Sequence, residues 1–350
     1  MAYTTIDDPT IYFNTLLYTG NSTARSLTGV GFQPDWVWIK SRSNTYHHEL
    51  FDSVRGATKG LNSNRTNAEE TRSGITSFDS DGFSLGTAGR ENNNGDTKVA
   101  WNWKAGNSSG SSNSNGSITS TVSVSTDAGF SILSYTGTGS NATIGHGLGL
   151  VPAWIITKNR DATQPWRIYH KGVDASAPED YGLILSDTSV RDNDNTAWND
   201  TAPTSSVFSV GSSANTNNGS DDFIAYCFAE KTGYSKFGSY VGNGNADGTF
   251  IYTGFKPAWV LIKRTDGGTD NWNLYDNKRL GYNTNYSFLI ANENNAENTT
   301  TSTANLDILS NGFKIRGSTG HTNTSGGIYI FMAFAKSPFT NSNGVPNNAR

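Results

Sequence analysis

Residues 34–40 read Pro34-Asp35-Trp36-Val37-Trp38-Ile39-Lys40, and this stretch decides the fold that we expect. Its tryptophans alternate with Val37 and Ile39, so an extended strand would carry apolar side chains on both faces, as a strand in the middle of a layered structure requires. A proline at the first residue of a strand removes no hydrogen bond from the sheet. The stretch therefore predicts a central β-strand that is covered on both sides.

The same stretch occurs twice more, and other elements recur with it in the same order. The two further copies are Pro152-Ala153-Trp154-Ile155-Ile156-Thr157-Lys158 and Pro257-Ala258-Trp259-Val260-Leu261-Ile262-Lys263. Each copy is preceded by a Tyr-x-Gly turn, at 18–20, 135–137 and 240–242, and is followed by three further apolar stretches. These stretches are at 48–52, 81–86 and 99–103 in the first copy, at 166–170, 206–211 and 224–228 in the second, and at 272–276, 311–317 and 330–334 in the third. A pattern that returns at a fixed order predicts a repeat architecture.

At least five short strands per copy, bounded by turn residues and without an amphipathic helix, predict an all-β fold. We expect three tandem β-sandwich repeats of jelly-roll-like form, with a propeller-like closure as the alternative. The predicted boundaries are 1–106, 118–232 and 233–340 for the repeats, 107–117 for a flexible Ser/Gly/Asn linker and 341–350 for a flexible polar tail. The loops at 61–77, 187–203 and 291–306 differ most among the copies.

Composition narrows the range of partners. The 350 residues carry a net charge of -4 and only 16% charged residues, with no basic cluster of the kind that binds nucleic acid. No apolar run is long enough to cross a bilayer, and the first residues do not read as a secretory signal. The single cysteine, Cys227, lies in an apolar run and is expected to be buried.

Few residues in the sequence suggest chemistry. Asp52 and Asp276 occupy the same place in two copies, but His170 replaces them in the third, so we interpret them as caps of turns and not as acid/base groups. His47 and His48 are neighbours on a strand and point to opposite faces, which disfavours a shared metal. The run Asp192 to Asn195 lacks the glycine and the distal glutamate of a calcium loop. We therefore predict no catalytic residue, no metal and no cofactor.

Trp198 is the one residue that we single out as a candidate ligand contact. It lies in a polar loop and has no counterpart in the other copies, so an exposed ring could stack against a sugar. The alternative is that the ring folds back and anchors its own loop.

The repeated motifs resemble those of an uncharacterised triple-repeat β-domain family of tailed, notably marine, bacteriophages. The resemblance covers nearly the whole chain and is carried by three runs, Tyr252 to Val260, Tyr226 to Glu230 and Ile328 to Ala335. Proteins of that family are met as tail fibres or other virion structural components, which implies a displayed role and supplies no catalytic residues. Residues 1–15 also look like the start of free-standing members.

The sequence thus favours a non-enzymatic virion protein, a tail fibre or receptor-binding appendage that presents loops to a glycan or protein of the host surface. One alternative is a capsid decoration or head-appendage protein; another is a polysaccharide-degrading enzyme. The expected partners are other virion proteins and a host receptor, and we expect a homo-oligomer, with a trimer suggested by analogy.

Overall fold

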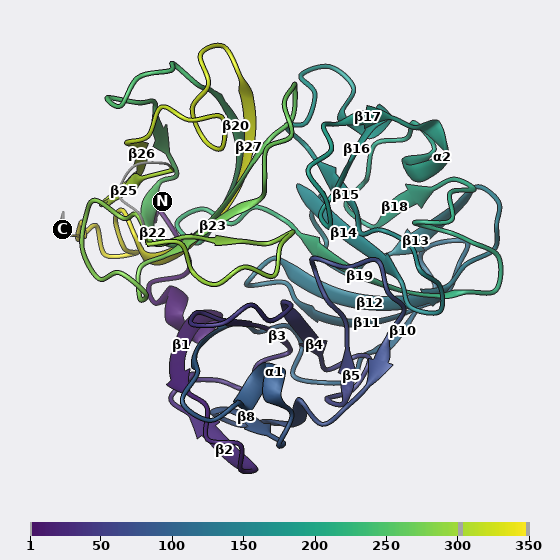
Figure 1. Cartoon of the computed structure of the whole chain (residues 1–350). Helices are drawn as coiled ribbons and strands as arrows, with labels where there is room; N and C mark the ends of the chain where they lie inside the picture. Colours follow the sequence, from purple (N-terminus) through teal and green to yellow (C-terminus); the bar gives the residue numbers. More distant parts are fainter. Residues whose placement is uncertain (1, 300–303, 348–350) are drawn as a thin grey trace.

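The computed structural model describes residues 2–299 and 304–347, and nearly all of their regular structure is β. The strands fall into three groups arranged around a common centre, which Figure 1 shows in the order purple-blue, teal and green-yellow. We call them unit 1 (β1 to β9), unit 2 (β10 to β19) and unit 3 (β20 to β27). The prediction of an all-β sandwich fold is confirmed; that the units are tandem copies of one domain stays a prediction.

The bounds of the elements follow the apolar stretches of the sequence. Unit 1 has η1 (Pro9–Ile11), β1 (Phe13–Thr19), β2 (Arg25–Thr28), β3 (Trp36–Ser41), β4 (Glu49–Asp52), β5 (Lys59–Gly60), β6 (Glu70–Thr71), β7 (Ile75–Asp79), β8 (Gly82–Leu85), α1 (Gly89–Asn92) and β9 (Thr97–Trp103). Unit 2 has β10 (Ser111–Asn113), β11 (Ser120–Ser125), β12 (Phe130–Thr136), β13 (Ala142–Gly145), β14 (Trp154–Asn159), β15 (Arg167–His170), η2 (Pro178–Asp180), β16 (Tyr181–Ile184), β17 (Asp192–Asn193), α2 (Asn195–Trp198), β18 (Val207–Val210) and β19 (Asp222–Phe228). Unit 3 has β20 (Ser235–Val241), β21 (Phe250–Tyr252), β22 (Phe255–Arg264), β23 (Asn273–Asp276), β24 (Leu289–Ile290), β25 (Leu306–Leu309), β26 (Gly312–Ile315) and β27 (Ile328–Pro338).

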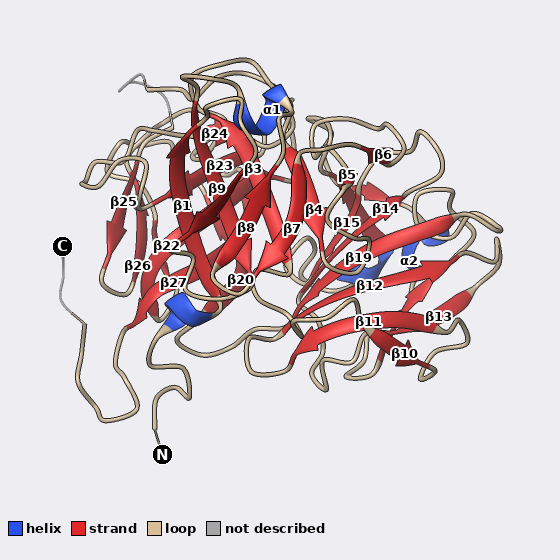
Figure 2. Ribbon diagram, turned by 90° about the horizontal axis from the view of Figure 1, so that it is seen from below, coloured by secondary structure: helices blue, strands red, loops and turns tan. Residues whose placement is uncertain are grey.

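Each unit has one main antiparallel sheet with the same strand order. The orders are β1-β9-β3-β4 in unit 1, β12-β19-β14-β15 within the larger sheet of unit 2, and β20-β27-β22-β23 in unit 3. A smaller sheet packs on one face of each main sheet, namely β2-β8-β7, β13-β18 and β21-β26-β25 (Figure 2). In every unit the last strand (β9, β19 or β27) therefore lies between the edge strand of this four-strand order (β1, β12 or β20) and the central strand (β3, β14 or β22).

The two faces of the main sheets are buried against different neighbours. On β3, Val37 and Ile39 pack in an apolar cluster within unit 1, between the main and the small sheet. Trp36 and Trp38 point the other way, into one large cluster that draws on all three units. This shared core contains eight of the nine tryptophans, Trp36, Trp38, Trp101, Trp103, Trp154, Trp166, Trp259 and Trp272, together with Phe130, Tyr226, Phe228, Phe237 and Phe334.

The structure differs from the expected linker and tail. Residues 107–117, expected to be a flexible linker, contain β10, which pairs with β11, and the backbone N–H of Asn107 donates to Asp35 of unit 1 at 3.0 Å. The Ser/Asn composition favours coil in isolation but does not prevent pairing when a strand edge is at hand. In the tail, Ser342 donates to Asp7, while residues 348–350 lie outside the described chain.

No helix among residues 2–299 and 304–347 has the length and apolarity needed to cross a membrane.

We predict that the protein unfolds in a single cooperative transition, because the three units bury their tryptophans against one another and not separately. Trp36 lies 4.4 Å from Trp103 and 4.5 Å from Tyr226 between ring centroids. Trp36→Ala should lower the free energy of unfolding by about 3–5 kcal/mol and move the whole transition. Differential scanning calorimetry checks this, with the exposed Val345→Ala as control; several separate heat-absorption peaks would contradict it.

Candidate functional site

Trp198, predicted as an exposed ligand contact, is buried. Its side chain is 2% exposed, and its ring centroid lies 6.1 Å from that of Tyr169 and 6.4 Å from that of Phe208. Asp194 caps α2 by accepting from the backbone N–H of Thr196, and this short helix turns the ring inward. The expectation of an exposed platform is therefore wrong, and Trp198 anchors its loop.

Asp52 and Asp276 form buried ion pairs at equivalent turns. Asp52 binds Arg55 Nε at 2.5 Å, and Asp276 binds Arg279 Nε at the same distance. Each carboxylate also accepts from the following turn and from the next unit: Tyr226 Oη donates to Asp52 at 2.7 Å, and Trp101 Nε1 donates to Asp276 at 3.0 Å. These groups cap turns and join units.

His170 takes the equivalent place in unit 2, where its neighbour offers no such donor. By the strand registers, the position of Trp101 and Tyr226 is held by Met332 in unit 3. Burial lowers the pKa of His170 to about 3, and its Nδ1 accepts from the backbone N–H of Gly172 at 2.9 Å. A neutral histidine thus replaces a carboxylate where the donor is lost.

A buried lysine is the next-to-last residue of each of the three central strands, β3, β14 and β22, and its ammonium group contacts the neighbouring unit. Lys40 Nζ donates to the carbonyl of Asn294 at 3.2 Å, Lys158 Nζ to that of Thr66 at 3.1 Å, and Lys263 Nζ to that of Thr188 at 2.9 Å. The contacts run from unit 1 to unit 3, from unit 2 to unit 1 and from unit 3 to unit 2, which closes a cycle. Burial lowers the pKa of Lys40 and Lys158 to about 7 and that of Lys263 to about 8.

A second ring of contacts follows the same cycle. Trp166 Nε1 donates to the carbonyl of Asn62 at 2.7 Å, Trp272 Nε1 donates to that of Ile184 at 2.8 Å, and His48 Nε2 lies 2.9 Å from that of Ile290. The loops that differ most among the copies are therefore held against a neighbouring unit at the three seams. The sequence carried a signal for this, since all three apolar stretches end in a lysine.

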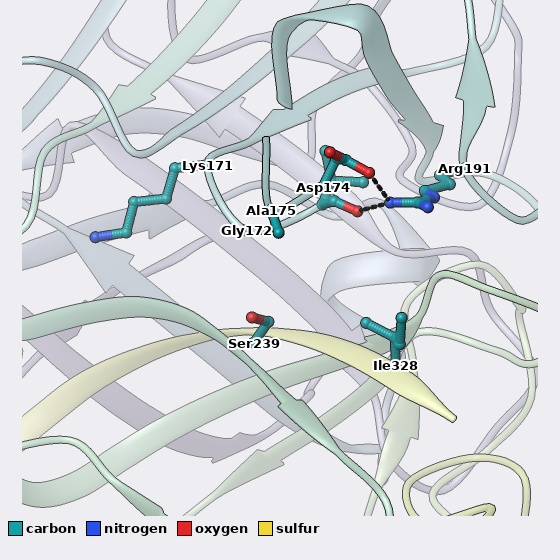
Figure 3. Close-up of a pocket in the computed structure, with 8 residues that line it drawn as sticks. Lys171, Gly172, Asp174, Ala175, Arg191, Ser239 and Ile328 are labelled. Atoms are coloured by element: carbon teal, nitrogen blue, oxygen red, sulfur yellow. Dashed lines mark hydrogen bonds and ion pairs between the residues drawn. The ribbon is translucent and has the colours of Figure 1, made fainter. Parts of the chain in front are cut away.

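Groove 1 lies at the seam between units 2 and 3 and has a volume of about 370 Å³. It is lined by the turn after β15 (Lys171 to Ala175) and Arg191 on one side and by Ser239 and Ile328 on the other (Figure 3). Its charged groups are paired: Arg191 Nη1 lies 2.8 Å from Asp174, and Lys171 Nζ lies 2.6 Å from Glu230.

Groove 2 lies between units 1 and 3 and has a volume of about 480 Å³. It is lined by His47 and Asn64 of unit 1 and by the run Asn292-Glu293-Asn294-Asn295 of unit 3. Asn64 Nδ2 lies 2.8 Å from His47 Nδ1, and burial together with nearby arginines lowers the pKa of His47. Lys40 and His48 bind the carbonyls of Asn294 and Ile290, so hydrogen bonds from unit 1 hold this wall of the groove in place. Sequence reasoning did not find this groove.

One cluster of acidic groups is buried inside unit 1. Glu49 and Glu91 are both inaccessible to solvent, and burial raises the pKa of each. Arg72 pairs with both carboxylates, and Arg90 lies 3.4 Å from Glu49. The arginines lower the pKa of each carboxyl group, but burial outweighs them and favours the protonated acids. In the described part of the chain, no three His, Cys, Asp or Glu side chains gather as metal ligands.

Residues 8–338 match the family described as Domain of unknown function (DUF7483). The chain belongs to this family. The matched residues cover all three units of the chain, from the start of η1 to the end of β27. No curated protein and no solved structure matches the chain.

We predict that His170 makes the protein less stable in acid. Between pH 6.5 and about 3 the unfolded chain binds a proton at His170 and the folded chain does not, so stability is present above pH 6.5 and is lost as the pH falls. The difference in unfolding free energy between the wild type and His170→Gln should change by up to ~1.4 kcal/mol per pH unit in this window. Urea unfolding at pH 4 to 7 measures it. His321→Gln, at a 35% exposed side chain, is the control; parallel wild-type and His170→Gln curves would contradict the prediction.

Lys158→Met should loosen the seam between units 1 and 2, because it removes the hydrogen bonds from Nζ to the carbonyls of Thr66, Asn159 and Ala162. We expect a loss of about 1–3 kcal/mol in unfolding free energy and faster amide hydrogen exchange at Glu69, whose N–H donates to Arg160 across this seam. The exposed Lys278→Met is the matched control. Unchanged exchange at Glu69 would show that the lysine does not hold the loop.

Proposed function

We propose that the protein is a structural component of a bacteriophage virion that binds a hydroxyl-rich ligand of the host surface, such as a glycan, at groove 2. The phage part of the proposal is supported by the resemblance of the three repeated motifs to virion proteins. The ligand part is supported by one observation, the gathering of amide side chains in a groove of about 480 Å³ between two units.

The chemistry of groove 2 suits neutral hydroxyl groups. An amide side chain offers both donors and an acceptor, and a sugar hydroxyl also donates and accepts, so the two can pair in either direction. Asn294 and Asn295 are exposed, and Glu293 adds a carboxylate acceptor that already binds Asn271 and Asn295. Groove 1 is a poorer candidate for such a ligand because its charged side chains are occupied by one another.

The loop that forms groove 2 is held before any ligand arrives. Lys40 and His48 bind two of its carbonyls from unit 1, and the backbone N–H of Glu297 donates to the carbonyl of Arg42 at 2.8 Å. The ion pair of Arg42 and Glu297, at 2.9 Å, closes the same seam. A loop fixed in this way loses little conformational entropy when it binds, which favours affinity. A binding loop on a rigid frame is a common arrangement in recognition proteins.

We predict that Asn294→Ala/Asn295→Ala weakens binding to isolated host envelope about tenfold, since about two hydrogen bonds are lost. Surface plasmon resonance with immobilised envelope polysaccharide measures this, and Asn343→Ala, an exposed asparagine at the other end of the chain, is the matched control. Equal binding by both variants would remove groove 2 from the proposal.

Cryo-electron microscopy of purified particles tests the virion role itself. A few copies at the tail support host recognition, whereas hundreds of copies on the shell indicate a decoration protein. Absence from the particle would overturn the proposal, and release of new reducing ends from host polysaccharide would replace it with a degrading enzyme.

A further inference from the structure

We propose that the edge of β20, which pairs with no strand among residues 2–299 and 304–347, binds an extended segment of a partner polypeptide as an added β-strand alongside groove 1. The edge lies at the seam of units 2 and 3 (Figure 1), and its Ser239 faces the turn after β15 across the groove (Figure 3). The inference is independent of ligand binding at groove 2.

The hydrogen bonds that bracket β20 define which of its backbone groups face outward. Ala335 N–H donates to Tyr234 O and Gly242 N–H donates to Gly327 O, so the even-numbered residues bond toward β27. In an antiparallel sheet, the backbone N–H and C=O groups of successive residues point alternately to the two neighbouring strands. The backbone groups that point away from β27 are therefore those of the odd-numbered residues 235, 237, 239 and 241. Ser235 N–H donates to Lys231 O, and Val241 O accepts from Thr249. The backbone groups of Phe237 and Ser239 remain in the middle of this edge.

The equivalent edge in unit 2, that of β12, shows which kind of strand can pair at this position. β12 has the same place in its sheet as β20, and its outer side is paired with β11. Ile132 and Ser134 stand opposite Ser123 and Thr121, and by strand order and register they correspond to Phe237 and Ser239. In unit 2 the chain therefore covers the equivalent edge with its own strand β11.

In unit 1 the equivalent edge is closed differently. There β1 pairs with β9, and its outward N–H of Thr15 donates to the side chain of Asn14 at 3.0 Å. The outward carbonyl of Thr19 accepts from Arg25. One edge is therefore covered by a strand and one has side-chain caps at Thr15 and Thr19, whereas Ser239, in the middle of the edge strand β20, lines groove 1. Open strand edges bind extended peptides through main-chain hydrogen bonds.

The surroundings of β11 and of groove 1 indicate which side chains the partner segment would carry. On β11, Val122 packs into the apolar cluster of unit 2, while Ser123 faces the seam, where its Oγ accepts from the backbone N–H of Gly106. At groove 1 the seam side is narrow, since a Cβ placed on Gly172 would lie 3.4 Å from that of Ser239. The segment that fits alternates Val-like residues with Ser, Thr or Gly, as β11 does at the equivalent edge of unit 2.

Fluorescence anisotropy of the whole chain with a labelled peptide of residues 119–126, Thr-Ser-Thr-Val-Ser-Val-Ser-Thr, tests the proposal. Saturable binding is expected, and Ser239→Pro, which removes the outward N–H, should weaken it at least tenfold. Leu17→Pro, at the equivalent place on β1, is the matched control and should bind as the wild type does.

Ala175→Trp keeps the test valid if the proline variant does not fold, because it fills groove 1 from the opposite wall and leaves the sequence of β20 unchanged. It should also abolish binding. Absence of wild-type binding at millimolar peptide, or equal binding by Ala175→Trp, would overturn the proposal. A dimer in sedimentation that Ser239→Pro or Ala175→Trp dissociates would overturn it in favour of a second copy as the occupant.

Discussion

The structure depends on the burial of eight tryptophans in a core that no unit completes alone. Each main sheet has one face covered by its own small sheet, and its other face carries indole and phenyl rings that would meet water if the unit stood by itself. An aromatic side chain removes a large apolar area from water on burial, so this shared face dominates the stabilisation of the assembly. The three units are therefore held together by the same effect that folds each of them.

Polar contacts at the seams then define how the units face one another. Apolar packing is not directional, but lysines and indoles of one unit bind particular carbonyls of a neighbouring unit. Arg42 and Arg160 bind the carboxylates of Glu297 and Glu69 across two of the seams. The buried turn at Asp52 and Asp276 is matched to a donor across the seam, and His170 is used where Met332 replaces that donor. These pairs make the closed cycle specific, because a buried polar group without its partner is costly.

Much of the fold follows from local sequence pattern. The alternation in Trp36 to Ile39 predicted a strand with both faces buried, and the faces are buried as predicted. The pattern did not show what covers each face, since an apolar face reads the same whether its neighbour lies in the same unit or in another. Trp198 was singled out as a candidate ligand contact because its loop is polar, with a loop anchor as the alternative. The helix that Asp194 caps turns the ring inward, in agreement with the alternative. The grooves are formed by residues distant in sequence, so no local pattern could predict them.

The cycle of three seams lies within one polypeptide, and this has a consequence for how the surface can vary. In a symmetric homotrimer every substitution appears three times, so a site can be altered only in triplicate. Here the edges of β1, β12 and β20 occupy corresponding places but differ: that of β1 has side-chain caps, that of β12 is covered by β11, and that of β20 pairs with no strand of the described residues. The three units surround one centre, and the sequence at each edge can change independently of the other two. The strand addition proposed at β20 would therefore occur once per chain.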